Sequence, residues 1–149
     1  MTSADDTTTR TVVEELLRRI AAGDPEHVAE LYADDTDWKL NWPEEEHGRT
    51  ATPWIRPRRT RADAAAHYRE LGAHHRPDEV DTRVERVLVD GADAVVLGEI
   101  RQTAAATGRA YRARFALHLT VTDGLVVRHH VYEDSLAVSR AFTPDGHPG

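Results

Sequence analysis

The chain has 149 residues, the length of one domain, and a chain of this size can bury enough surface for a full core. It contains no cysteine, which excludes disulfides, thiolate metal sites and thiol nucleophiles. Its 19 basic and 26 acidic residues leave a net charge of −7, which argues against nucleic acid as a partner. No apolar run approaches the ~20 residues of a membrane span, and residues 1–10 lack the apolar segment of a secretory signal. We therefore expect a cytoplasmic protein that binds neither nucleic acid nor membrane.

The first predicted element is a helix that begins near Thr11. Thr11 and Glu14 form a capping-box pattern, and apolar residues follow at helical spacing. We expect residues 1–10 and 143–149 to be disordered tails on either side of a single domain, residues 11–142.

A Gly-Asp-Pro sequence ends this helix and begins a short second one, with Asp24 as its cap. Residues 36–42 then alternate, with Trp38, Leu40 and Trp42 on one face, which predicts a strand buried on one side. A long loop over residues 44–59 follows, of a length that is often functional or mobile.

Thr60 and Asp63 predict the cap of a third helix that runs to about His74. After it, the hydrophobic pattern changes to a period of two, which is typical of strands. The four predicted strands are Val84–Val89, Ala94–Thr103, Tyr111–Val121 and Leu125–Tyr132. Two Asp-Gly pairs and one Thr-Gly pair separate them, and Asp-Gly between alternating segments is a strong hairpin signal. Asp134–Phe142 could form a short closing helix. The order predicts an α+β fold, with one curved antiparallel sheet and three helices packed over one face.

Three short segments occur within this order. They are Ala22–Pro25 followed by Leu31–Asp35, then Thr107–Phe115, then Thr122–Val127 followed by Tyr132–Ser135. With the element order, they resemble the NTF2-like superfamily, and within it the SnoaL-like and ketosteroid-isomerase-like proteins. The resemblance implies a cone with a pocket between sheet and helices, and a homodimer, which we expect to form through the outer sheet face. It implies no cofactor.

The superfamily contains several chemistries, and fold does not choose among them. The polar residues of a steroid isomerase fall on Leu16, Leu40 and Leu117, which argues against that mechanism. A limonene-type epoxide hydrolase needs a carboxylate–arginine pair, which Glu99 and Arg101 supply only after a shift of one residue.

SnoaL-like cyclases use an Asp or His as acid–base group in an apolar pocket, and the resemblance places His129 there. Glu133 lies on the same face and is predicted to orient or charge His129. The residues alone do not decide whether His129 or His130 faces the pocket. A two-residue turn at Asp123-Gly124 directs His130 and Tyr132 inward, and a three-residue loop directs His129 inward. The alternative for His129 is a strand histidine bonded to a neighbour or lying at a dimer face.

The predicted pocket walls are aromatic or apolar side chains: Tyr32, Trp38, Trp42, Trp54, Phe115 and Leu117. Residues 54–59 could form a lid that brings cations to an acidic substrate, although we favour an exposed arginine-rich loop. No metal site is expected, because His67 and His74 lie two helical turns apart without an obvious third ligand.

The leading hypothesis is a SnoaL-like small-molecule enzyme that performs isomerase- or cyclase-type acid–base chemistry on an apolar, carbonyl-bearing ligand. The missing family acids leave open whether the chain is catalytic at all. One alternative is therefore a non-catalytic ligand-binding or dimeric assembly module, and another is a limonene-type epoxide hydrolase.

Overall fold

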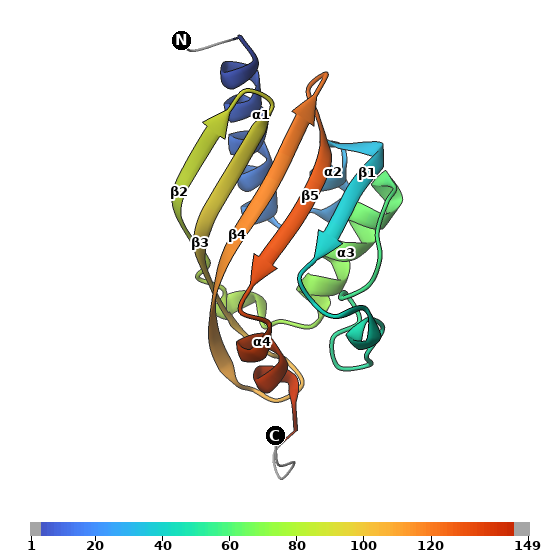
Figure 1. The fold of residues 1–149 in the computed structure, drawn as a ribbon. Helices are drawn as coiled ribbons and strands as arrows, with labels where there is room; N and C mark the ends of the chain where they lie inside the picture. Colours follow the sequence, from blue (N-terminus) through green and yellow to red (C-terminus); the bar gives the residue numbers. More distant parts are fainter. Residues whose placement is uncertain (1–3, 145–149) are drawn as a thin grey trace.

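A strongly curved five-stranded sheet dominates the computed structural model, which describes residues 4–144 (Figure 1). The strands are β1 (Tyr32–Leu40), β2 (Arg83–Asp90), β3 (Asp93–Thr103), β4 (Ala110–Thr122) and β5 (Leu125–Glu133), in the sheet order β1-β5-β4-β3-β2. Strands β2 to β5 form the predicted antiparallel meander. Strand β1 instead pairs in parallel with β5, which corrects the expectation of an antiparallel sheet throughout. No hairpin joins β1 to its neighbour, so no turn imposes an antiparallel direction on it.

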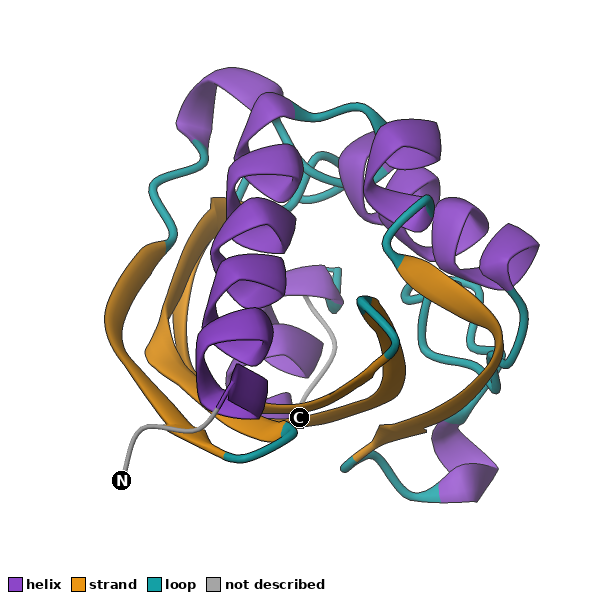
Figure 2. Ribbon diagram, turned by 90° about the horizontal axis from the view of Figure 1, so that it is seen from above, coloured by secondary structure: helices purple, strands orange, loops and turns teal. Residues whose placement is uncertain are grey.

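Four α-helices accompany the sheet: α1 (Ala4–Ala22), α2 (Pro25–Ala29), α3 (Arg61–Ala73) and α4 (Ser135–Phe142). Single 3₁₀ turns occur at Glu44–Glu46 and Pro77–Glu79. The first three helices close over the concave side of the sheet (Figure 2), and the α+β cone is confirmed. The predicted cap at Thr60 begins α3, where Thr60 and Asp63 form a capping box, and Asp24 caps α2.

The N-terminal segment differs from its prediction, because residues 4–10 are the first turns of α1 and not a disordered tail. Thr9 is buried, and its hydroxyl donates a hydrogen bond to the carbonyl of Gly91 at 2.8 Å. Polar side chains therefore attach these turns to the β2–β3 hairpin. Because residues 4–10 lack the apolar stripe by which a helix is recognised in sequence, they were not predicted as helical. At the other end, Thr143 caps α4. The remaining predicted tail residues, 1–3 and 145–149, lie outside the described part.

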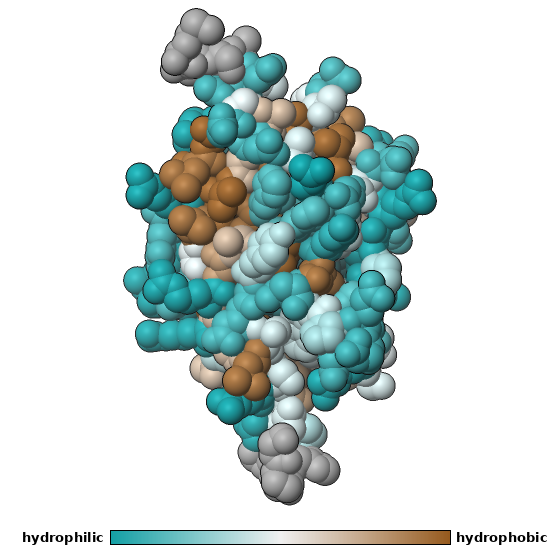
Figure 3. Space-filling view, viewed as in Figure 1, coloured by the Kyte–Doolittle hydropathy of each residue, from teal (hydrophilic) through white to brown (hydrophobic). Residues whose placement is uncertain are grey.

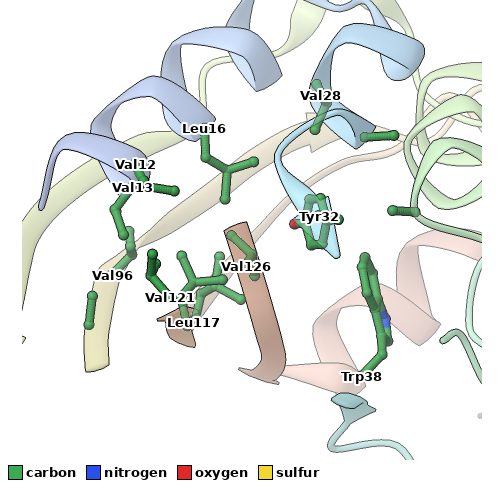
Figure 4. Packing of buried hydrophobic residues seen from close by; sticks show 14 of the residues in the cluster. Val12, Val13, Leu16, Val28, Tyr32, Trp38, Val96, Leu117, Val121 and Val126 are labelled. Atoms are coloured by element: carbon green, nitrogen blue, oxygen red, sulfur yellow. The ribbon is translucent and has the colours of Figure 1, made fainter. Parts of the chain in front are cut away.

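Two apolar clusters fill the concave side. The central cluster joins α1, α2 and α3 to the sheet, and Val12, Val13 and Leu16 of α1 point toward the strands in Figure 4. Its sheet side includes Tyr32, Trp38, Val96, Leu117, Leu119, Val121 and Val126. The end cluster lies near α4 and contains Trp42, Trp54, Ile55, Ala104, Ala113, Val138, Ala141 and Phe142. The long loop over residues 44–59 is thus anchored, because Trp54 and Ile55 are both buried in this end cluster.

Candidate active site

A β-bulge decides which histidine of β5 faces the interior. The Asp123-Gly124 turn has two residues, with φ of 53° and 77°, as a type I′ hairpin requires. The register of β4 and β5 then shifts by one, with Val127 as the additional residue of β5. This shift reverses the alternation that a regular two-residue hairpin would give. His129 consequently pairs with Leu119 on the concave side, and Tyr132 lies outward with 54% exposure.

His129 lies at one end of a buried hydrogen-bond chain. Its Nδ1 is 2.9 Å from the hydroxyl of Tyr32, which is 2.7 Å from the hydroxyl of Tyr68 on α3. The indole of Trp38 stacks on the imidazole, with ring centroids 3.7 Å apart and planes 9° apart. Two contacts therefore fix the ring, while Nε2 is buried and has no hydrogen-bond partner. Tyr32 and Trp38 are seen side by side in Figure 4.

The surroundings keep this chain uncharged near neutral pH. Burial lowers the pKa of His129 well below its usual range, and the nearby imidazoles of His67 and His130 act in the same direction. Burial likewise raises the pKa values of Tyr32 and Tyr68. At pH 7 the imidazole is consequently neutral and both phenols are protonated.

His67 of α3 is a second buried histidine beside Trp38. Its ring centroid is 4.9 Å from that of Trp38 and 6.1 Å from that of His129. Burial, with help from the positive charge of Arg58, lowers the pKa of His67 to about 3. Its Nδ1 has no partner, and neither has Nε1 of Trp38. Several buried polar atoms without partners thus gather around one stacked pair of rings.

The arginine-rich segment is only partly exposed, in contrast to the favoured expectation. The side chains of Arg56 and Arg59 are 47% and 75% exposed, but that of Arg58 is 0% exposed. Arg58 donates a hydrogen bond to Glu70 of α3 at 2.7 Å. A cleft of about 410 Å³ opens where β1 departs from its regular pairing with β5. Its lining consists of Asp35, Thr36, Asp37, Trp38, Arg58, Arg59 and Val127.

Glu133 does not join His129. Its carboxylate accepts a hydrogen bond from Nε1 of Trp42 at 2.8 Å, and burial raises its pKa. Four residues along a strand span about 13 Å, so one face does not bring the two side chains into contact. Tyr32, not Glu133, is the hydrogen-bond partner of His129.

The predicted pocket walls divide between the two clusters. Tyr32, Trp38 and Leu117 belong to the central cluster, and Phe115 packs against it. Trp42 and Trp54 belong to the end cluster, where Trp54 packs on Phe142.

Three residues around Trp38 and Tyr32 were missed as site residues: His67, Tyr68 and Arg58. A sequence signal existed for His67, because it shares one helical face with Ala64 and Leu71. No comparable signal existed for Arg58, whose burial depends on Glu70.

The residues of the other chemistries do not form a site. Glu99 and Arg101 pair with each other at 2.6 Å, on the opposite face of β3 from the buried Val96. Leu16 and Leu117, which align with polar residues of a steroid isomerase, are buried in the core as apolar side chains. Within residues 4–144, no group of three or more histidines and carboxylates could hold a metal ion. No helix in that range is both long and apolar enough to cross a bilayer.

Comparisons with known proteins agree with this fold. The family model of the SnoaL-like domain matches residues 13–129. No curated protein matches the sequence. An NTF2-like protein from Burkholderia thailandensis superposes with a TM-score of 0.76 at 18% identity, over 91% of this chain and 98% of that one.

Two further structures are similar. A Jannaschia protein provisionally assigned as a SnoaL-like polyketide cyclase gives a TM-score of 0.72 at 19% identity, over 98% of this chain and 97% of that one. A Catenulispora acidiphila protein with a ketosteroid isomerase-like fold, in complex with trimethylamine, gives 0.69 at 12% identity, over 92% and 97%. At these identities the structural matches establish the fold.

Proposed function

The chain belongs to the SnoaL-like domain family, and on that premise we propose that it is an enzyme that moves a proton on a small apolar, carbonyl-bearing ligand. His129 is the acid–base group of this proposal, and no cofactor takes part. One observation carries it: a buried, neutral imidazole presents an Nε2 without a partner, while Nδ1 is held by Tyr32. A general base needs such a nitrogen within reach of the proton that it abstracts.

The two tyrosines give this nitrogen both roles. When the Tyr32 hydroxyl donates to Nδ1, Nε2 carries the imidazole proton and acts as an acid. When Nδ1 donates to Tyr32, which then donates to Tyr68, Nε2 has a free lone pair and acts as a base. If Nε2 takes a proton from the ligand, Nδ1 passes its proton to the Tyr32 hydroxyl, and Tyr32 passes its own to Tyr68. Tyr68, which is only half-buried, releases its proton to solvent. The imidazole then never has to carry a charge in the core, which burial makes costly.

Tyr32 therefore replaces Glu133 as the residue that orients His129. Trp38 holds the ring plane by stacking, and Leu117 belongs to the apolar wall. Glu133 is assigned the separate task of holding Trp42.

The proposal is tested by hydrogen exchange on a probe ketone, 2-tetralone, in deuterated water. Mass spectrometry measures the deuterium that enters the carbon next to the carbonyl. We expect exchange above the uncatalysed rate for the wild type and a loss of about 100-fold or more for His129→Gln, in line with the usual contribution of a general base.

The neighbouring His130→Gln is the matched control, because His130 faces the outer surface and pairs with Asp37 at 3.0 Å. It should exchange like the wild type. Equal rates in His129→Gln and His130→Gln would overturn the assignment of His129.

A ligand-binding module without catalysis is the second candidate. The burial of Nε2 favours it, because the atom has no contact with solvent in this arrangement. In the exchange experiment, this candidate predicts binding of 2-tetralone without deuterium uptake.

We also propose a homodimer through the convex face of the sheet. Apolar side chains gather on that face over β2 and β3 (Figure 3). Leu88 of β2 and Tyr132 of β5 are 44% and 54% exposed. Large exposed apolar side chains on one sheet face are typical of an interaction surface.

A further inference from the structure

The guanidinium of Arg58 is buried, and its single hydrogen-bond partner satisfies only one of its three nitrogen atoms. Its side chain is 0% exposed, and only Nη2 donates a hydrogen bond, to Glu70. Nε and Nη1 are buried without a hydrogen-bond partner. Donors left unsatisfied in the interior cost free energy, so a fold that keeps them is expected to use them.

Arg58 shares its hydrogen-bonded carboxylate with a second cation. Glu70 accepts from both Arg56, at 2.6 Å, and Arg58, at 2.7 Å, so one carboxylate serves two cations. The neighbouring carboxylates have their own partners. Asp35 pairs with Arg59 at 2.9 Å, and Asp63 accepts the backbone amides of Arg59 and Thr60 at the start of α3.

The acidic lining of the cleft is compensated as well. Besides Asp35, it contains Asp37, which lies 3.0 Å from His130 and 3.6 Å from Arg128. Of the two arginines that line this cleft, Arg59 pairs with Asp35, whereas Arg58 shares Glu70 with Arg56.

Arg58 lies in the wall of the cleft together with Trp38, the residue that stacks on His129. Nε1 of Trp38 is also buried without a partner. Arg58 and Trp38 can only donate hydrogen bonds, so the group that completes them must be an acceptor. A carboxylate offers two acceptor oxygens and a negative charge, and a charged acceptor makes a stronger hydrogen bond to a guanidinium than a neutral one does.

We propose that Arg58 and Trp38 form a carboxylate-binding subsite, so that the ligand of this protein is a small carboxylic acid. Arg58 binds the carboxylate, and Glu70 positions the guanidinium. That the remainder of the ligand faces His129 rests on the proposed function, but the carboxylate subsite itself does not.

The test compares two probes of nearly equal shape, phenylacetate and phenylacetamide, by titration calorimetry at pH 7. The wild type should bind the acid at least tenfold more tightly than the amide, because a charged acceptor makes a stronger hydrogen bond to the guanidinium than a neutral one. Arg58→Gln should lose this preference. Arg56→Gln is the matched control, since it removes an exposed partner of the same Glu70 and should keep the preference.

A second variant keeps the test valid if Arg58→Gln fails to fold. Glu70→Gln keeps an acceptor that positions the guanidinium of Arg58 but removes a negative charge beside the subsite, so phenylacetate should bind more tightly than to the wild type. A purely structural Arg58–Glu70 pair predicts no tightening.

The proposal is overturned if the wild type binds neither probe or binds both equally. It is also overturned if Arg56→Gln loses the preference as fully as Arg58→Gln. His129→Gln should still prefer phenylacetate, so a failure of the proposed acid–base function and a failure of this subsite give different results.

Discussion

The two buried histidines beside Trp38 link the site to the pH dependence of folding. In the native state, burial lowers the pKa of His67 to about 3 and also lowers that of His129. In the unfolded chain both imidazoles return to about 6.5, so below that pH the unfolded state binds more protons. Stability therefore falls as pH decreases through 6.5, and it continues to fall toward the native pKa.

For His67 alone, this linkage costs about 2 kcal/mol between pH 7 and pH 5. We expect His67→Gln to reduce the pH dependence of the free energy of unfolding by about that amount, measured by urea denaturation at both pH values. His27→Gln is the control, because His27 is exposed on α2. Glu133, whose pKa is raised, acts in the opposite direction at lower pH and is common to all variants. An unchanged pH dependence in His67→Gln would show that His67 is not held neutral by the fold.

At the scale of single elements, the last hairpin and the start of α3 were predictable, whereas the start of α1 and the bulge were not: Thr11, the predicted start of the first helix, lies inside α1. The Asp123-Gly124 hairpin and the capping box at Thr60 follow from residues adjacent in sequence. The bulge at Val127 has no local marker, since neither glycine nor proline occurs there. The direction of His129 depends on that bulge, so only the family resemblance indicated it.

The packing of β3 against β2 and Phe115 requires glycine at position 98, and a substitution there tests this requirement. A Cβ at this position would lie 2.2 Å from the carbonyl oxygen of Arg83 and 2.8 Å from the ring of Phe115. Gly98→Ala must therefore shift the β2 backbone or the Phe115 ring, and overpacking of this kind costs about 1–3 kcal/mol.

Gly72→Ala is the opposite case, because nothing lies within 4 Å of a Cβ there and the residue is helical. It should stabilise the protein by about 0.4–1 kcal/mol. Thermal and urea unfolding of both variants would check the two signs. Equal effects would contradict the packing around Gly98.

For the whole molecule, the order of elements and the hydrophobic periodicity predicted the α+β fold, and the family resemblance implied its cone shape. The partners within it could not be predicted, because they depend on contacts between distant segments. Arg58 is buried by Glu70 of α3, and Trp42 meets Glu133 of β5. The length of the loop over residues 44–59 suggested a functional or mobile segment, and this loop packs into the end cluster through Trp54 and Ile55.

The proposed dimer is a property of the whole molecule. Leu88→Glu places a charge on the apolar part of the convex face, where the native side chain is 44% exposed. We expect the mass measured by analytical ultracentrifugation to fall from that of a dimer to that of a monomer. Leu136→Glu, at a similarly exposed position on α4, should remain dimeric. A monomeric wild type would contradict the proposal.

In the proposed function, His129 is a neutral imidazole whose Nε2 meets the ligand. Nitrogen NMR of the histidine side chains tests this assignment, through a titration from pH 8 to pH 5 with and without phenylacetate or 2-tetralone. We expect His129 to stay neutral throughout, and 2-tetralone to change the shift of its Nε2 while the shifts of exposed His27 stay unchanged. Titration of His129 near pH 6.5, or an Nε2 signal unaffected by the ketone, would contradict it.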